Sequence, residues 1–515
     1  MKSINILLTI IFTSLLFSGC SVKEKPLERP NILFIMSDDH SYQTISAYND
    51  KLIETPNLDR IADEGVIFHN SFVGNSICAP SRATMLTGKH THKNGQINNA
   101  VTFDGSQVTF PKLLKAAGYQ TALVGKWHLK SDPTGFDYWN VLPGQGQYYN
   151  PDFIEMGEKK QFEGYCTDLT TDFGLNWLDN RDKEKPFCLL LHHKAPHRTW
   201  QPDTLYLDEF KDKVYPVPAN FFDNYEGRQA AMEQHLSIRS SDMDVNYDLK
   251  MEDEKIKGRF GNIKHTARMN EKQRERWLAH YKPITKDFLE KNLEGDELYL
   301  WKYQRYMRDY LACIRSVDEN VGRVLDYLEE NGLADNTLVV YTSDQGFYMG
   351  EHGWFDKRFM YEQSFRTPLL MRLPKGYHRK GEVPELVQNI DYAPTFLDFA
   401  GIEIPFEIQG KSMKPLLVDN KNVEWRDAVY YHYYEFPNEH GVKKHYGIRT
   451  DKYKLIHFYN DIDVWELYDL EKDPDEMNNV FGKPVYAEIQ KNMEIRLTEL
   501  RKEYEDDSMN EQLKN

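Results

Sequence analysis

Four short apolar runs, separated by helical segments, constrain the fold of this chain most strongly. The first run, at 32–36, is continuously apolar, as expected for a strand buried on both faces of a parallel sheet. Comparable strands are expected at 119–128, 185–197 and 336–346. The helices that alternate with them are expected at 55–65, 78–88, 110–118, 170–180 and 316–332. This alternation predicts an α/β fold in which helices sandwich a mixed, mostly parallel sheet.

Two regions depart from this alternation and indicate the domain organisation. Residues from about 202 to 291 are polar, charged and poor in apolar runs, so we expect an insertion of helical or irregular structure without an independent core. From residue 419 the composition becomes rich in aromatic residues. Strands are expected there at 425–436, 445–459 and 463–474, followed by a charged helix at 485–504. We therefore expect a large α/β domain over 30–418 and a smaller antiparallel α+β domain over 419–515.

The first twenty residues resemble a bacterial export signal. A basic start precedes an apolar run at 4–17, which is short for a stable transmembrane span, and small residues directly precede Cys20. This pattern resembles a lipobox and predicts a lipoprotein signal peptide over 1–20, lipidation of Cys20 and a polar linker over 21–29. An uncleaved anchor and an ordinary signal peptide are the alternatives. The expected location is the periplasm or the outer membrane of a Gram-negative bacterium, with membrane contact only through the N-terminal lipid.

The net charge of −16 limits the classes of ligand that the chain can bind. Nucleic-acid backbones select basic surfaces, so nucleic acid is not expected as a partner. If the substrate is an anion, a local cluster of basic residues must attract it, because the overall field of the protein opposes it.

Acidic and amide residues occur directly after two of the apolar runs. Asp38 and Asp39 follow the first run, and Asp344 and Gln345 follow the last. In an open parallel sheet, ligands bind outside the carboxyl ends of the strands, so residues far apart in the sequence can meet there. Three carboxylates and an amide oxygen form a hard oxygen site, suited to Ca²⁺ or Mg²⁺ rather than to zinc. Either pair alone is more typical of a solvated loop, but their shared position at strand ends favours a metal.

Basic residues recur at the same kind of position. Lys126 and His128 end the second expected strand, His197 ends the third, and Lys357 lies soon after the last. Together with Arg82 they would line a cationic pocket whose natural occupant is a small tetrahedral oxyanion. Taken singly, each of these residues is more typical of a surface group or a satisfied core residue.

Cys78 stands at the start of an expected helix, in the stretch SICAPSRATMLTGKH. Pro80 suits the first turn of that helix, and Gly88 suits its C-terminal cap. A cysteine in this place lies where the helix dipole favours negative charge. A buried cysteine that acts as a small hydrophobe is an equally common explanation.

The motif CAPSR at 78–82, followed by TG at 87–88, resembles the signature of the formylglycine-dependent sulfatases. These enzymes belong to the alkaline-phosphatase-like superfamily. The resemblance covers nearly the whole chain from Arg29 and includes, in order, DDH, TPNLDRIADEG, GKWH, APH, SDQG and the pattern K-x-x-x-Y-E-x-x-x-R-x-P. It implies an alkaline-phosphatase-like fold and a sulfuric ester hydrolase.

The resemblance also implies a role for each motif residue. Cys78 would be oxidised by a dedicated maturation enzyme to formylglycine, whose hydrated aldehyde is the nucleophile. The ligands of one Ca²⁺ would be Asp38, Asp39, the modified Cys78, Asp344 and Gln345. Many family members have asparagine or histidine at the position of Gln345, so this ligand departs from the common pattern.

The remaining motif residues are implied to act on the sulfate and on its leaving group. Arg82 would hold the formylglycine, and Lys126 and Lys357 would neutralise sulfate oxygens. His128 would contact the formylglycine as a base, and His197 would protonate the leaving oxygen.

Segments at 346–368 and 445–479 look similar to bacterial glycosaminoglycan sulfatases, above all to N-acetylglucosamine-6-O-sulfatases acting on heparin or heparan sulfate fragments. The similarity implies exo-acting 6-O-desulfation of N-acetylglucosamine or glucosamine. The alternatives are a sulfatase for another glycan (2-O-sulfate or galactose sulfate) and a phosphoester or phosphonate hydrolase. The residues expected to line the sugar subsite are His440, Lys444, His445 and Arg449, for which a solvated edge strand is an equally common explanation.

Overall fold

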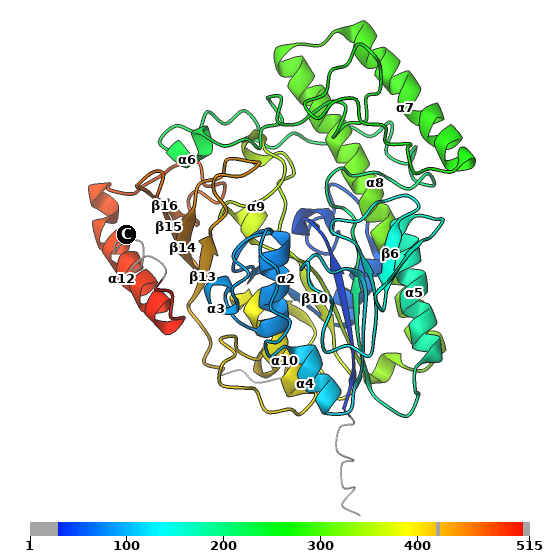
Figure 1. Ribbon diagram of the computed structural model, residues 1–515. Helices are drawn as coiled ribbons and strands as arrows, with labels where there is room; N and C mark the ends of the chain where they lie inside the picture. The colour runs from blue at the N-terminus through cyan, green and yellow to red at the C-terminus, as the bar shows by residue number, and fades with distance from the viewer. Residues whose placement is uncertain (1–28, 419–422, 508–515) are drawn as a thin grey trace, which may run out of the picture.

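A ten-stranded sheet forms the centre of the larger domain in the computed structural model of the protein, which describes residues 29–418 and 423–507 (Figure 1). In spatial order its strands are β11 (Gly381–Val383), β2 (Val66–Phe68), β10 (Leu369–Arg372), β9 (Thr337–Ser343), β1 (Asn31–Ser37), β8 (Phe187–His192), β4 (Gln120–Lys126), β5 (Tyr138–Leu142), β6 (Asp152–Glu155) and β7 (Glu158–Gln161). The central strands β9, β1, β8, β4 and β5 run parallel, while β10, β6 and β7 introduce antiparallel pairs. The predicted mixed, mostly parallel sheet is confirmed.

Helices cover both faces of this sheet. One face carries α1 (Pro56–Glu64), α5 (Cys166–Asn180) and α8 (Gly295–Glu330), and the other carries α2 (Cys78–Thr87), α4 (Phe110–Ala116) and α10 (Tyr392–Phe399). Successive residues of β1 alternate between the two layers: Leu33 and Ile35 pack with the first set, and Ile32 and Phe34 with the second. A strand buried on both faces explains why the run at 32–36 is continuously apolar.

The helix α8 is much longer than the sequence predicts. Its expected span was 316–332, whereas it begins at Gly295 and ends at Glu330. The added first half contains buried charged residues such as Lys302, Arg305 and Asp309, which interrupt the apolar spacing that marks an amphipathic helix.

The predicted insertion consists of irregular segments with the short helix α6 (Gln229–Met232) and ends in α7 (Glu271–Lys291). Its apolar side chains, among them Phe210, Met243 and Trp277, join the core on the α8 side of the sheet. The apolar side chains of this region therefore contribute to the core of the larger domain. In Figure 1, α7 and the first part of α8 project from the body as a hairpin.

The smaller domain is an antiparallel sheet of four strands, β13 (Ala428–Tyr433), β14 (His445–Thr450), β15 (Tyr453–Phe458) and β16 (Val464–Asp469). One face packs on α12 (Ala487–Glu503) through residues such as Tyr430 and Ile448. The other face packs on the larger domain, where Tyr431 and Ile456 meet Trp354 and Tyr361. The expected antiparallel α+β domain is confirmed, although the predicted boundary at residue 419 lies outside the described residues.

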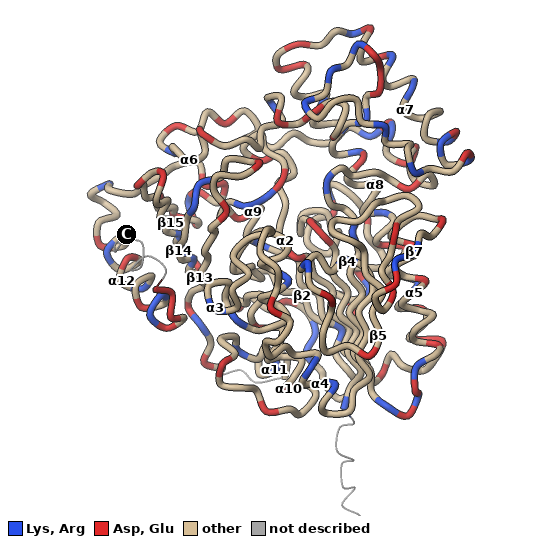
Figure 2. Tube along the Cα trace, in the orientation of Figure 1, with Lys and Arg blue, Asp and Glu red and all other residues tan. Residues whose placement is uncertain are grey.

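The surface and the N-terminal region complete this description. Positions of both charge signs occur in every part of the trace, so the acidic excess is not confined to one domain (Figure 2). Among the described residues, no helix combines the length and apolarity needed to cross a bilayer. The predicted signal peptide and Cys20 lie outside the described residues.

Gly125 in β4 is expected not to tolerate a side chain. Its φ is +102°, and a Cβ atom there would lie 1.9 Å from the carbonyl oxygen of His192 in the adjacent strand. Gly118 has a similar φ of +93° but open space around the Cβ position. A substitution there therefore measures the cost of backbone strain without a steric clash. We expect Gly118→Ala to lower the free energy of unfolding by about 1–2 kcal/mol and Gly125→Ala by about 3 kcal/mol or more, measured by denaturant titration. Equal losses would contradict the role assigned to the close strand contact.

Candidate active site

Three buried carboxylates meet at the carboxyl ends of β1 and β9. These strands pair in parallel with Ser37 opposite Ser343, so Asp38 and Asp344 emerge next to each other. Carboxylate oxygens of Asp38, Asp39 and Asp344, called here the acidic cluster, lie within 4.8 Å of one another, and all three residues are fully buried. The backbone N–H of Asp39 donates to Asp344 Oδ1 at 3.1 Å. The two pairs therefore meet, as their positions at strand ends predicted.

Cys78 lies beside the acidic cluster, at the first residue of α2. The predicted helix is present, and Gly88, with a φ of 64°, caps its C-terminal end after Thr87. Cys78 Sγ lies 3.5 Å from Asp38 Oδ1, 3.7 Å from Lys357 Nζ and 3.8 Å from Gln345 Nε2. Burial raises the pKa of the thiol to about 12. The thiol is therefore protonated near neutral pH and is a poor nucleophile as it stands.

Two lysines contact the first pair of carboxylates. Lys126 Nζ donates to Asp38 and, at 2.6 Å, to Gln145 Oε1. Lys357 Nζ donates to both oxygens of Asp39, at 2.5 and 2.6 Å. Burial alone would raise the pKa of Asp38, but the ammonium group of Lys126 lowers this pKa well below its usual range. Asp38 is therefore ionised although water does not reach it.

Arg82 binds the third carboxylate. Its Nε and Nη2 donate to Asp344 Oδ2 at 3.0 and 2.8 Å, and its Nη1 donates to the backbone oxygen of Lys126 at 2.7 Å. Burial raises the pKa of Asp344 to about 7, and the negative charge of Asp38 acts in the same direction. Because burial is the main cause, a further positive charge bound beside Asp344 would favour the ionised form of its carboxyl group.

Gln345 adds an amide oxygen to this set of donors. Its Nε2 donates to Asp39, and its Oε1 is buried without a hydrogen-bond partner among the described residues. Buried polar atoms without a partner are rare in native proteins and call for a reason. Three carboxylates and one amide oxygen match the ligands that Ca²⁺ and Mg²⁺ prefer. The residues present therefore fit a hard divalent cation.

Two histidines stand at the edge of the same site. His197 donates from Nδ1 to the backbone oxygen of Arg198 at 2.6 Å, which leaves an unprotonated Nε2 at 3.8 Å from Asp39 Oδ2. Burial lowers the pKa of His197 well below its usual value and the pKa of His128 to about 2. His128 has a positive φ of 57°, and its buried Nδ1 has no hydrogen-bond partner in the described part of the chain. Both rings are therefore neutral.

Two charged residues beside Lys357 escape prediction from the sequence. Asp356 and Arg358 are buried and have φ values of 70° and 96°, a strained conformation for residues other than glycine. Asp356 Oδ2 lies 3.4 Å from His440 Nε2, and Arg358 Nη1 donates to Glu435 at 2.9 Å. The only signal in the sequence is the run of three charges in an otherwise aromatic segment.

A cavity of about 340 Å³ opens beside His197. Tyr148, Lys194 and Arg198 are among the residues that line it. Lys194 Nζ lies 4.7 Å from the centroid of the Tyr148 ring, and burial lowers the pKa of this lysine to about 8. Basic and aromatic walls next to the acidic cluster suit a polar, anionic ligand. Lys194 could not be predicted, because a lone lysine after a strand is usually a surface residue.

The structure places His445 and Arg449 in the interior rather than in a sugar subsite. Both are buried in β14, an inner strand of its sheet. His445 Nε2 accepts a hydrogen bond from the backbone N–H of Met360 at 3.1 Å, and Arg449 Nε lies 3.4 Å from Glu362 Oε1. Their side chains therefore hold a loop of the larger domain. Lys444 is partly exposed, directly before β14.

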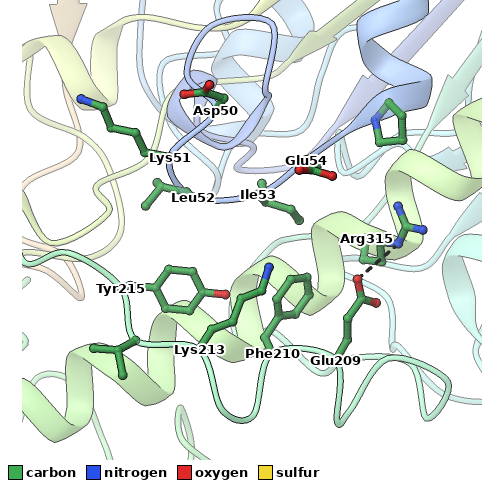
Figure 3. Close-up of a pocket in the computed structure, with 12 residues that line it drawn as sticks. Asp50, Lys51, Leu52, Ile53, Glu54, Glu209, Phe210, Lys213, Tyr215 and Arg315 are labelled. Carbon is green, nitrogen blue, oxygen red and sulfur yellow. Dashed lines mark ion pairs between the residues drawn. The ribbon is translucent and has the colours of Figure 1, made fainter.

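A second cavity is separate from this site. It has a volume of about 480 Å³ and lies between the segments 50–56 and 209–215 (Figure 3). Side chains of both charge signs line it, among them Glu54, Lys213 and Arg315. None of its lining residues belongs to the acidic cluster.

Several known proteins are similar to this chain. The N-acetylglucosamine-6-O-sulfatase of Bacteroides thetaiotaomicron is 50% identical over 521 residues, covering 99% of this chain and 93% of the relative. The N-acetylglucosamine-6-sulfatase of Capra hircus is 28% identical, covering 94% of this chain and 85% of the relative. A solved structure, described as a complex with its substrate D-glucosamine-2-N,6-O-disulfate, superposes with a TM-score of 0.90 at 52% identity and covers 93% of this chain and 99% of that chain.

Two family models also match the chain. The model described as N-sulphoglucosamine sulphohydrolase, C-terminal, matches residues 350–503. The model of the sulfatases matches residues 30–402, which include every residue of the acidic cluster, Cys78 and the cations around them. Because this match spans most of the chain and a half-identical relative extends along nearly all of it, the protein belongs to the sulfatase family.

Proposed function

We propose that this sulfatase removes the 6-O-sulfate group from a terminal N-acetylglucosamine or glucosamine residue of heparin or heparan sulfate fragments. The observation that carries the proposal is that Cys78, the acidic cluster and three buried cations occupy one site. The sugar and the 6-position are supported by the names of the half-identical relative and of the ligand in the similar solved structure. Action at chain ends is supported by the net charge of −16, which disfavours binding of a long polyanion along the surface.

Two groups that the chain does not itself encode complete the proposed site. Asp38, Asp39, Asp344 and Gln345 would hold a divalent cation, for which we propose Ca²⁺, with Mg²⁺ as the less suited alternative. When present, the cation and a formylglycine made from Cys78 supply an acidified hydroxyl group as the nucleophile. The protonated thiol is only 1% exposed, so a maturation enzyme would have to act on it before the site closes around it.

The cations of the chain are arranged to receive the sulfate group. The ammonium group of Lys126 contacts Asp38, and that of Lys357 contacts Asp39. A sulfate group bound between the two lysines would have two of its oxygens neutralised. Arg82, fixed by Asp344 and a backbone oxygen, holds the position next to residue 78. These groups are buried, so they lose little energy to reorganisation when the charge on the sulfate shifts.

The histidines would handle the protons. His197 is fixed by its Nδ1 hydrogen bond, so its Nε2 faces the site in one orientation. An anionic substrate next to it raises the pKa of the ring, which allows Nε2 to carry a proton and donate it to the leaving sugar oxygen. The buried Nδ1 of His128 has no hydrogen-bond partner among the described residues, so this ring suits the role of base.

The sugar would be recognised beside Lys357. Asp356 and Arg358 flank this lysine, and His440 contacts Asp356 from the smaller domain. Burial alone would raise the pKa of Asp356, but His440 and Arg358 lower it well below its usual range, so the carboxylate can accept hydrogen bonds from sugar hydroxyl groups.

Export and lipidation at Cys20, expected from the first twenty residues, complete the proposal and are tested by fractionating cells that express Cys20→Ala.

Replacement of Cys78 is expected to abolish sulfate ester hydrolysis. Cys78→Ala should lower kcat/KM for N-acetylglucosamine-6-sulfate at least about a thousandfold, as removal of a nucleophile does. Cys188→Ala is the matched control, because Cys188 is also fully buried but lies in β8 away from the acidic cluster. Mass spectrometry of the Cys78 peptide from active protein should show the aldehyde. An unmodified thiol in fully active protein, or a preference for the matched phosphate ester, would overturn the proposal.

Removal of divalent cations should inactivate the protein and destabilise it. Ca²⁺ added at about one hundred times its Kd to chelator-treated protein should raise the free energy of unfolding by about 2.7 kcal/mol, observed as a rise in Tm. In Asp39→Asn this rise should be much smaller, because one of the three carboxylates no longer carries charge. A rise of the same size in the variant would show that Ca²⁺ binds elsewhere, and a larger rise with Mg²⁺ would reassign the metal.

Substitution of His440 should affect catalysis, whereas substitution of Arg449 should affect stability. His440→Gln is expected to lower kcat/KM for N-acetylglucosamine-6-sulfate about tenfold, mainly through KM, because Asp356 loses one of its two partners and keeps only Arg358. Arg449→Gln should instead lower the free energy of unfolding by about 3 kcal/mol, because it leaves part of the charge of Glu362 buried without a partner. Comparing kinetics with thermal unfolding separates the two; a loss of stability in both variants with unchanged KM would remove His440 from the subsite.

A further inference from the structure

A cavity of about 510 Å³ lies on the hairpin formed by α7 and the first part of α8, which projects from the body of the protein (Figure 1). Its apolar wall consists of Pro283, Ile284, Leu300 and Trp301. The partly exposed ring of Trp301 packs against Phe288, with ring centroids 4.5 Å apart. An indole held in place beside apolar side chains presents a surface against which the C–H face of a sugar ring can pack.

Four cationic side chains line the same cavity, together with one carboxylate. The cations are Lys211, Lys291, Arg305 and Arg308, and the carboxylate is that of Asp287. Asp287 pairs with Lys291 at 2.8 Å. Arg308 donates to a backbone carbonyl group, and over the described ranges neither Arg308 nor Lys211 has a carboxylate at ion-pair distance. The cavity therefore carries an excess of positive charge in a protein whose net charge is −16.

The two arginines show that this positive charge is not fully balanced. Arg305 is only 2% exposed and donates from Nη2 to Asp309 at 2.6 Å, but its Nε is buried without a hydrogen-bond partner among the described residues. Burial and the nearby charge of Arg305 lower the pKa of Arg308. An anionic ligand would relieve this repulsion and supply acceptors for the unused donors.

We propose that this cavity is a second carbohydrate-binding site, separate from the active site, which takes a sulfated sugar residue of the glycan. The sugar ring would pack on Trp301, and a sulfate group would bind Arg308 and Lys211. The choice of a sulfated glycan rests on the proposed function and on charge complementarity. The cavity of Figure 3 does not share this character, because acidic and basic residues line it in similar numbers. None of the residues lining the proposed site belongs to the acidic cluster or to the cavity beside His197.

The test measures the binding of a size-defined heparin oligosaccharide to full-length protein in the Cys78→Ala background, where the ester is not hydrolysed. The double variant Lys211→Gln/Arg308→Gln and the single variant Trp301→Ala should each bind at least about tenfold more weakly than the parent, because charge-assisted contacts and packing are lost. Lys282→Gln/Lys286→Gln is the matched control: it removes the same charge from exposed positions of α7 that do not line the cavity. Trp301→Phe should restore most of the affinity.

The outcomes distinguish this proposal from the proposed function. With Cys78 intact, the cavity variants should hydrolyse the monosaccharide N-acetylglucosamine-6-sulfate at the parent rate, so a failure of the 6-O-sulfatase activity would leave the binding comparison readable. Equal affinities of the cavity variants and the control for the oligosaccharide would overturn the second site. Equal binding of a desulfated oligosaccharide would overturn the role of sulfate. If the variants lose binding only to anionic phospholipid vesicles, the cavity is a membrane contact and not a glycan site.

Discussion

Mutual neutralisation of buried charges is the constraint on which the rest of this structure depends. Three carboxylates within 4.8 Å of one another, all fully buried, could not remain ionised without partners. The partners come from three places: Arg82 from α2, Lys126 from the end of β4 and Lys357 from the loop after β9. Each of these elements must be correctly placed for its cation to contact a carboxylate of the acidic cluster. The site therefore helps to fix the fold that carries it.

The core of the fold and the acidic cluster could be predicted because both depend on the apolar runs. A run that is buried on two faces must be a central strand, and whatever follows it must emerge at the carboxyl edge of the sheet. Asp38, Asp344 and Lys126 are found by this reasoning alone. The strands β2, β10 and β11 could not be found, because each has only three or four residues. The first half of α8 was missed because its buried charges mask the helical period.

The fold of the smaller domain was predicted correctly, but the expected sugar-subsite role of His445 and Arg449 was not found. One strand was expected over 445–459, where the structure has the two paired strands β14 and β15. The sequence pattern does not say which face of such a strand is buried or which strands pair with it. His445 and Arg449 lie two strand periods apart on one face, and that face packs against the larger domain. Basic residues on an exposed edge could have met a substrate. On an inner strand against a second domain they become structural contacts.

These contacts give the smaller domain a direct connection to the chemistry. The loop that contains Lys357 continues into α9 (Glu362–Phe365), and three side chains of the smaller sheet contact this segment. His445 accepts a hydrogen bond from the backbone N–H of Met360, and Tyr431 donates to the backbone oxygen of Arg358. Lys454 pairs with Glu362 at 2.9 Å. A lysine whose neighbours adopt positive φ values would not keep its place without such restraint. The smaller domain thus positions Lys357, one of the cations of the active site. His445 and Arg449, which were expected to contact the sugar, instead support the segment that follows this lysine.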